Sequence, residues 1–227
     1  IFDQTNNAKL VLNKDYTLTY KNNTKQGTAT VTVRGKGNYT GSVVKEFNIG
    51  PADIGTATVV VADKAYANRK NAYKSTVTVK DVNGRNLTAG TDYEKTIEYF
   101  YENGQPVGTD DIPAAGTVIK VTVTGKGNYT GTVSATYRVV ATSIANANVK
   151  VLTQYYTGKE VKPGKSDITV KVGSVTLDES DYEIVSYANN VNKGNATVVL
   201  KGVGNYGGTK SVTFKIAQKN FINAIWR

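Results

Sequence analysis

The most constraining feature of this chain is a glycine-rich heptapeptide that occurs three times. It reads GKGNYTG at 35–41 and again at 125–131, and GVGNYGG at 202–208. An alternating apolar run precedes and follows each occurrence. Internal repetition indicates an architecture more strongly than any single residue, because each repeat must be one structural unit. The chain is therefore predicted to be a series of similar small modules, a pattern typical of adhesive or structural proteins.

The repeat extends beyond the glycines. An Asp-Tyr pair precedes the heptapeptide each time, at Asp15-Tyr16, Asp92-Tyr93 and Asp181-Tyr182. A glycine then opens the next strand, at Gly27, Gly116 and Gly194. After this glycine the apolar residues lie two apart: Ala29, Val31 and Val33, then Ile119, Val121 and Val123, then Ala196, Val198 and Leu200. Alternation of this kind predicts strands that bury one face.

The closing strands after the heptapeptide alternate in the same way, with Phe47 and Ile49, Tyr137 and Val139, and Phe214 and Ile216. One-sided strands bury their apolar faces most simply when two sheets pack together. We therefore predict an all-β chain of tandem immunoglobulin-like β-sandwich modules, with β-grasp-like modules as the alternative.

The repeat period divides the chain into four segments. Residues 1–50 correspond to the C-terminal half of a repeat, residues 51–140 and 141–217 to complete modules, and residues 218–227 to the start of a further repeat. The half repeat lacks its opening strands, which predicts unpaired strand edges and an uncovered apolar face. Head-to-tail self-association of the partial repeats is one expected way to cover them.

The middle module carries an insertion at 100–116 that the other repeats lack. Its Asn103-Gly104 dipeptide predicts a turn, and the segment is expected to form an extended hairpin loop. Loops are where repeat modules differ and where binding residues concentrate. The candidate binding residues are therefore Tyr99, Phe100, Tyr101, Asn103, Gln105, Asp110 and Asp111.

The repeated tyrosines and glycines are assigned structural roles. Tyr39, Tyr129 and Tyr206 are expected to bury their rings and to place their hydroxyls on backbone groups, as a tyrosine corner does. Tyr16, Tyr93 and Tyr182 of the Asp-Tyr pairs are expected to act similarly at the other end of the module. The first glycines, Gly35, Gly125 and Gly202, are expected to permit a close backbone approach in a tight connection.

Composition narrows the function classes. The sequence contains neither histidine nor cysteine, so Ser-His-Asp and Cys-His catalysis, thiolate metal sites and disulfides are excluded. The remaining enzymatic route is a pair of carboxylates. The candidates are Glu102, Asp110 and Asp111, or Glu179 and Asp181, but the preference of such residues for turns and solvated loops accounts for their positions. We expect a non-enzymatic protein that uses neither a metal nor a cofactor.

The net charge of +10 is spread along the strands. Dispersed lysines protect exposed strand edges, and they also attract anionic surfaces such as a teichoic-acid cell wall. A nucleic-acid partner is not expected, because no basic run interleaves with aromatic residues. The sequence contains no window of 18 consecutive apolar residues, so no membrane-spanning helix is predicted.

The string YTGKEVKP at 156–163, followed by DY, Y-x-NN, G-x-ATV, GxGNYxG and a closing F-x-I, resembles the bacterial Ig-like repeats of Firmicute cell-surface proteins. The resemblance covers about residues 11–225. The middle repeat departs from it, since the insertion replaces the Tyr-x-Asn-Asn turn and Ala72-Tyr73 stands where Lys-Pro is expected.

The resemblance implies an extracellular protein at the bacterial surface, wall-attached or secreted. The expected function is that of a non-catalytic adhesive or binding module, or of a stalk. One alternative is a superantigen-like module that binds host immunoglobulin, since some similar tandem modules of gut commensals do so. A second alternative is the ancillary glycan-binding or cell-wall-binding part of an exported hydrolase. The expected partner is accordingly a host surface protein, a glycan or the cell wall.

Overall fold

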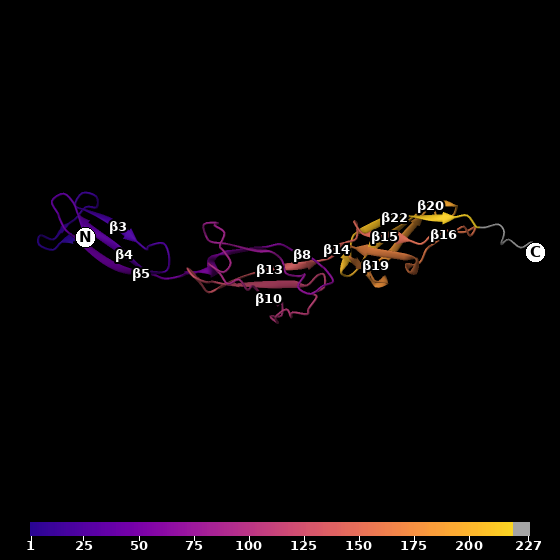
Figure 1. The fold of residues 1–227 in the computed structure, drawn as a ribbon, viewed down its shortest axis with the longest axis horizontal. Helices are drawn as coiled ribbons and strands as arrows, with labels where there is room; N and C mark the ends of the chain where they lie inside the picture. Colours follow the sequence, from indigo (N-terminus) through magenta and orange to yellow (C-terminus); the bar gives the residue numbers. More distant parts are fainter. Residues whose placement is uncertain (220–227) are drawn as a thin grey trace, which may run out of the picture. The chain divides into compact units, whose positions relative to one another are not determined.

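The computed structural model describes residues 1–219 (Figure 1). Most of the predicted further repeat, residues 220–227, lies outside the described residues. The predicted all-β sandwich-type fold is confirmed, because strands dominate and the only helical elements in residues 1–219 are three short 3-10 turns. The chain forms two compact units: residues 1–60, 78–98 and 121–135 belong to unit 1, and residues 61–77, 99–120 and those from 136 onward belong to unit 2.

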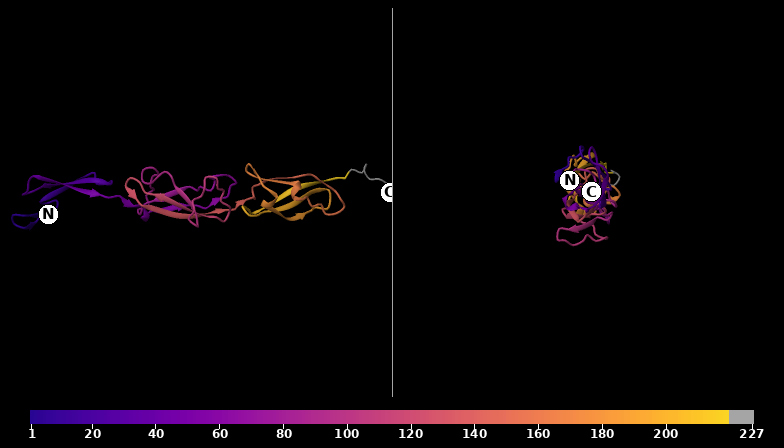
Figure 2. Two further views of the ribbon diagram at one scale, coloured as in Figure 1. Left: turned by 90° about the horizontal axis from the view of Figure 1, so that it is seen from below. Right: turned by 90° about the vertical axis from the view of Figure 1, so that its left-hand side faces the viewer.

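Unit 1 begins with the half repeat. Its main sheet is antiparallel and consists of β3 (Tyr16–Lys21), β4 (Gly27–Gly35) and β5 (Ser42–Ile49), which lie side by side in Figures 1 and 2. A small hairpin of β1 (Phe2–Asp3) and β2 (Ala8–Lys9) precedes it. Ala29 is fully buried, but Phe47 opposite it is 39% exposed, whereas the equivalent Phe214 of the third repeat is 3% exposed. The sheet of β3, β4 and β5 therefore leaves part of its apolar face open.

The rest of unit 1 comes from the middle repeat. Its strands and turn are β6 (Ala52–Asp53), η1 (Ile54–Thr56), β7 (Thr58–Val61), β9 (Val77–Lys80) and β12 (Tyr129–Thr130). The join between repeats is short, because β6 follows β5 directly and pairs in parallel with β12. Ile54, Val79, Tyr93 and Val121 are buried.

Unit 2 contains the remainder of the middle repeat. One sheet has the order β10 (Glu98–Tyr101), β11 (Val118–Thr124), β13 (Thr132–Val140) and β8 (Lys64–Ala65), and β11 and β13 run through both units. Tyr137 and Val139, which lie two apart on β13, are 4% and 1% exposed. Their common buried face is the one that the alternation predicts.

The third repeat lies wholly in unit 2 and closes its own interior (Figures 1 and 2). A four-stranded sheet consists of β16 (Gln154–Tyr155), β22 (Thr209–Ala217), β20 (Gly194–Gly202) and β19 (Tyr182–Ala188). A three-stranded sheet consists of β15 (Asn148–Val151), β17 (Ile168–Val172) and β18 (Val175–Thr176). Smaller elements are β14 (Thr142–Ser143), η2 (Lys165–Asp167), η3 (Glu179–Asp181) and β21 (Tyr206–Gly207). Sheets of four and three strands match the seven-strand immunoglobulin-like sandwich better than a β-grasp module.

Both sheets of the third repeat contribute alternate residues to this interior. Val170 of β17 and Val198, Leu200 and Ile216 of the larger sheet are each at most 1% exposed. Fully burying one such side chain contributes roughly 1.5–3 kcal/mol. The third repeat thus builds a core from the residues that the period of two assigns to one face.

The glycine heptapeptide forms the same turn in all three repeats. The amide of its first glycine donates to the carbonyl of its last glycine, from Gly35 to Gly41 at 3.0 Å, from Gly125 to Gly131 at 2.9 Å and from Gly202 to Gly208 at 3.0 Å. A Cβ atom on the first glycine would approach a backbone nitrogen within 2.8 Å at Gly35 and Gly125 and within 2.7 Å at Gly202. The first glycine is therefore required because the backbone approaches it too closely for a side chain.

The Asp-Tyr pairs lie beside this turn, not at the opposite end of the module as expected. The carbonyl of each aspartate accepts a hydrogen bond from the amide of the second heptapeptide residue. The donors are Lys36 to Asp15, Lys126 to Asp92 and Val203 to Asp181, each at 2.9 Å. The carboxylates accept from backbone amides three or four residues upstream. The pair and the heptapeptide therefore form one hydrogen-bonded unit.

The hydroxyls of the heptapeptide tyrosines differ from the predicted tyrosine corner. Tyr39 donates to the carboxylate of Asp3, and Tyr129 accepts from Arg85, so neither bonds the backbone. A nearby side chain satisfies each hydroxyl instead: the carboxylate of Asp3 accepts from Tyr39, and the guanidinium of Arg85 donates to Tyr129. Tyr206 buries its ring as expected (6% exposed), whereas Tyr39 and Tyr129 are half-buried. Of the Asp-Tyr pairs, Tyr182 is 1% exposed and its hydroxyl does reach backbone carbonyls, Tyr93 is 6% exposed, and Tyr16 is half-buried.

The turn predicts the effect of a substitution at its first glycine. We expect Gly202→Ala to destabilise the third repeat by about 1–3 kcal/mol, because the nearest atoms are backbone and cannot move aside. Gly164→Ala is the matched control: its Cβ would meet only the Ser166 hydroxyl, at 3.8 Å, and its φ of −80° suits alanine. Urea unfolding followed through NMR signals of residues 142–217 measures both, and equal midpoints would contradict the steric account.

Candidate functional site

The insertion of the middle repeat forms the expected hairpin on β10. The amide of Tyr101 donates to the carbonyl of Gln105 at 2.8 Å, and the amide of Gly104 donates back to the carbonyl of Tyr101 at 2.9 Å. Gly104 has a φ of +83°, which glycine adopts at little cost. The Asn103 side chain accepts from the amide of Gln105, and so it also stabilises the turn. The Asn103-Gly104 dipeptide therefore makes the reversal that the sequence predicts.

Asp111 holds the base of this hairpin. One of its carboxylate oxygens accepts both the Tyr101 hydroxyl at 2.9 Å and the amide of Gly108 at 2.8 Å. Asp110, next to it, pairs with Lys70 at 2.6 Å, but both side chains are more than 60% exposed. An exposed ion pair contributes little. Of the two predicted acidic residues, Asp111 is thus the structural one and Asp110 stays on the surface.

Tyr99 faces the module interior and not the partner side that the sequence suggested. Its ring meets Tyr73 edge to face at a centroid distance of 5.6 Å, and the ammonium of Lys74 lies 5.8 Å from its centroid. Tyr73 is 6% exposed, and its carbonyl accepts the Tyr137 hydroxyl at 2.6 Å. The sequence did not predict that Tyr73 supports Tyr99. The available signal was that Ala72-Tyr73 replaces the Lys-Pro dipeptide expected at this position.

The rest of the predicted set lies along the hairpin. Phe100 points to the opposite side of β10 from Tyr99 and Tyr101, is half-buried, and pairs with Pro106 across the hairpin. Asn103, Gln105 and Asp110 are exposed. The structure therefore divides the predicted binding residues into an inner set that supports the loop and an outer set that faces solvent.

The tyrosines at the base of the hairpin and in the module interior beneath it stay protonated over the physiological pH range. Burial, followed by the hydrogen bond to Asp111, raises the pKa of Tyr101 from 10.0 to about 12. Burial is also the largest cause of the raised pKa values of Tyr73, Tyr99 and Tyr137. These hydroxyls therefore act as hydrogen-bond donors and not as bases near neutral pH.

A shallow hollow lies beside the hairpin. Tyr101, Glu102 and Asn103 line one side of it, and Gly116, Thr117, Val118 and Arg138 line the other. Glu102 and Arg138 are exposed and carry opposite charges. A hollow of this kind suits a polar segment of a protein or glycan better than a small apolar ligand, which is usually buried in a concave pocket.

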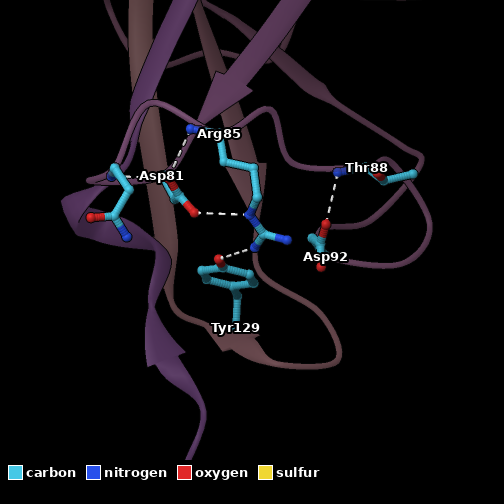
Figure 3. Close-up of polar contacts among 6 residues, drawn as sticks. Asp81, Arg85, Thr88, Asp92 and Tyr129 are labelled. Carbon is cyan, nitrogen blue, oxygen red and sulfur yellow. Dashed lines mark hydrogen bonds and ion pairs between the residues drawn. The ribbon is translucent and has the colours of Figure 1, made fainter. Parts of the chain in front are cut away.

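A second polar cluster lies in unit 1 (Figure 3). Asp81 accepts from the amides of Asn83 and Arg85 with one oxygen and from Arg85 Nε at 3.1 Å with the other. Arg85 Nη2 donates to the Tyr129 hydroxyl at 3.0 Å. The Arg85 hydrogen bond is the main cause of the lowered pKa of Asp81. The cluster therefore fixes the turn at 81–85 against the glycine turn, and its carboxylate is a permanent acceptor.

The asparagine of the glycine turn makes a contact that the sequence did not reveal. Asn128 Oδ1 accepts from the amide of Gln26 at 2.9 Å, and Asn205 Oδ1 accepts from the amide of Ala115 at 2.8 Å. Both donors belong to the preceding repeat and come directly before a glycine of positive φ, Gly27 at 128° and Gly116 at 94°. The same contact thus joins successive repeats in unit 1 and in unit 2.

The described residues offer no cluster of three or more Asp, Glu, His or Cys side chains for a metal ion. Over the same stretch, none of the helical elements has the length and apolar character needed for a membrane span. Neither a scan against protein-family models nor a search of curated proteins finds a match to this chain.

The Tyr101–Asp111 bond can be tested by titration. We expect Asp111→Asn to lower the pKa of Tyr101 from about 12 while leaving it above 10.0, because burial remains the largest cause of the shift. A raised tyrosine pKa stabilises the fold below pH 10 and loses this contribution as pH rises towards 12. Site-resolved NMR titration of labelled tyrosine measures the change. Asp110→Asn is the control and should leave the value unchanged; an equal shift in both variants would contradict the assignment.

The inter-repeat asparagine bond predicts local protection. We expect Asn205→Ala to increase hydrogen exchange at the Ala115 amide by about 5-fold to 10-fold, since one hydrogen bond contributes about 1 kcal/mol. Asn146→Ala removes the same side chain from an exposed position without such a bond and should leave Ala115 unchanged. Unaltered exchange at Ala115 in the Asn205 variant would show that the bond does not hold the two repeats together.

Proposed function

We propose that this chain is a non-catalytic repeat region of a bacterial cell-surface protein and that the hairpin of residues 98–116 is its contact surface for a partner protein. The observation that carries the proposal is the division of the hairpin into a braced base and an exposed edge. Asp111, Tyr101 and Tyr99 hold the base. Glu102, Asn103 and Gln105 are exposed at the tip.

Bracing favours binding because a loop held in one conformation loses little entropy on association. Two hydrogen bonds to Asp111 and the turn bonds around Gly104 restrict the loop before any partner arrives. Asparagine, exposed at the tip as Asn103, is also a side chain that protein-binding loops use for adaptable hydrogen bonds. The insertion occurs in the middle repeat alone, which supports a role beyond the shared fold.

A non-catalytic role is supported by the use of the carboxylates. Asp111 and Asp181 accept backbone and tyrosine hydrogen bonds, and Asp81 is paired with Arg85. A general acid or base needs a free group with a pKa near the working pH. Asp81, Asp111 and Asp181 are already engaged in these contacts and are not free groups.

A spacer role is the second candidate, and the repeated asparagine bond favours it. One hydrogen bond of the same type connects successive repeats on both occasions. A spacer requires such regular connections and no partner at the hairpin. The two candidates therefore differ in whether the outer edge of the hairpin binds anything.

Immunoglobulin is the first partner to test, because of the sequence resemblance, with cell-wall glycan as the second. The double variant Glu102→Ala, Gln105→Ala changes the outer edge without removing a side chain that braces the loop. The matched control, Gln4→Ala with Glu46→Ala, removes the same residue types from exposed positions of the half repeat.

We expect capture of a serum protein by the wild-type chain and by the control, with at least 10-fold weaker binding by the hairpin variant in a surface-binding assay. Equal binding by both variants would place the contact surface elsewhere. Capture of neither serum protein nor purified cell wall would leave the spacer function as the better conclusion.

A further inference from the structure

The junction between the middle and third repeats contains three contacts within unit 2. Asn205 accepts from the amide of Ala115, the rings of Tyr66 and Tyr206 meet edge to face with centroids 5.8 Å apart, and the hydroxyl of Thr142 donates to the carbonyl of Tyr66. Tyr66 is 9% exposed and Tyr206 is 6% exposed. The junction is thus a small interface with a buried aromatic pair and a backbone hydrogen bond.

The third repeat carries, at its own other end, the counterparts of the Ala115 amide donor and of the Tyr66 ring. Lys193 precedes Gly194, whose φ of +134° and pairing with Ile216 correspond to Gln26, Gly27 and Ile49. The amide of Tyr156 donates to the carbonyl of Ala217 at 2.9 Å, just as Tyr66 donates to Val140 at 2.8 Å. Lys193 and Tyr156 therefore correspond to Ala115 and Tyr66.

This end of the third repeat is open where the middle repeat is covered. Tyr156 is 40% exposed, against 9% for Tyr66. Within residues 1–219 the amide of Lys193 has no hydrogen-bond partner, whereas Gln26 and Ala115 donate to an asparagine. A surface hollow lined by Lys193, Gly194, Asn195 and residues 215–218 lies at this position.

The half repeat carries the complementary element. Its glycine turn at 35–41 has the hydrogen bonds of the turns at 125–131 and 202–208, so Asn38 corresponds to Asn128 and Asn205. Asn38 is exposed, whereas Asn128 and Asn205 are half-buried. Among the described residues, the Asn38 side chain accepts no hydrogen bond.

We propose that the open face formed by Tyr156, Lys193, Gly194 and residues 215–218 binds the glycine turn 35–41 of a second copy of this chain. Asn38 Oδ1 of one molecule accepts the Lys193 amide of the next, and Tyr39 covers the ring of Tyr156. The two surfaces differ from each other, so the contact is heterologous and adds molecules in an open series. The inference rests on an asparagine–amide bond that occurs twice within the chain and on one aromatic pair, Tyr66–Tyr206, and it is independent of the hairpin.

Charge makes this association weaker than the internal junctions. Lys36 adjoins Asn38, while Lys193 and Lys215 line the open face, so like charges approach each other. Screening by salt reduces such repulsion between exposed groups. The self-association should therefore strengthen as the ionic strength rises.

Cysteine crosslinking tests the contact directly, because the chain contains no cysteine. The variant Asn38→Cys, Lys193→Cys keeps the Lys193 backbone donor and places two thiols at the proposed contact. A disulfide requires Cα atoms within about 4.4–6.8 Å. We expect mild oxidation at high protein concentration and high salt to give dimers, trimers and larger species on a denaturing gel.

Two controls define the outcomes. Each single-cysteine variant can give dimers only, and Gln26→Cys with Asn128→Cys should close within one chain and so confirm that the geometry suits a disulfide. Trimers and larger species from the first double variant support the proposal. Monomers, or dimers alone, overturn it when the intrachain control closes.

Light scattering of the uncrosslinked chain gives an independent measurement. We expect Tyr156→Ser to weaken self-association at least 5-fold and Tyr155→Ser, at the more exposed neighbouring position, to leave it unchanged. A wild-type chain that stays monomeric at all concentrations, or equal effects of the two substitutions, would overturn the proposal. Serum-protein binding by the hairpin should be the same in both variants, so failure of one inference does not affect the other.

Discussion

The close backbone approach at the first glycine of each heptapeptide is the constraint on which the rest of the structure depends. The turn brings its two ends together through an amide–carbonyl bond, and the neighbouring aspartate carbonyl accepts the next amide along. These bonds set the direction in which the closing strand leaves and thus the face on which its apolar residues lie. The asparagine at the centre of the turn is left pointing outward, towards the preceding repeat. One local conformation therefore connects strand register, core formation and the contact between repeats.

The insertion of the middle repeat shows how a module can gain a new surface without losing its core. Tyr73 occupies the position where the third repeat has Pro163, and its ring gives Tyr99 a partner inside the module. The added loop is consequently attached by aromatic packing and by the carboxylate of Asp111, while the side chains of Glu102 and Gln105 at its tip are exposed. Comparable attachment by exposed ion pairs such as Lys70–Asp110 would leave the loop far less restrained.

Much of the fold could be predicted from the sequence, because period-two alternation and glycine turns are local signals. The buried sets around Val121 and Val198 and the hairpin turn at Asn103-Gly104 follow from spacing alone. The contacts of Asn128 and Asn205 could not be predicted, since their partners lie 102 and 90 residues away in sequence. The orientation of Tyr99 was equally out of reach, because the phase of a strand within an insertion depends on Tyr73, a residue that breaks the repeat pattern. The place of the Asp-Tyr pairs beside the turn depends on tertiary pairing for the same reason.

The difference in exposure between Tyr66 and Tyr156 has a consequence for how such an array comes apart. A repeat whose aromatic ring is capped by its successor gains stability from that neighbour, so the free energy of each repeat contains a nearest-neighbour term. A repeat without such a neighbour lacks this term and opens before a capped repeat under heat or protease. Opening then proceeds stepwise from an uncapped repeat, and the interior members of a longer series would be the most resistant to digestion.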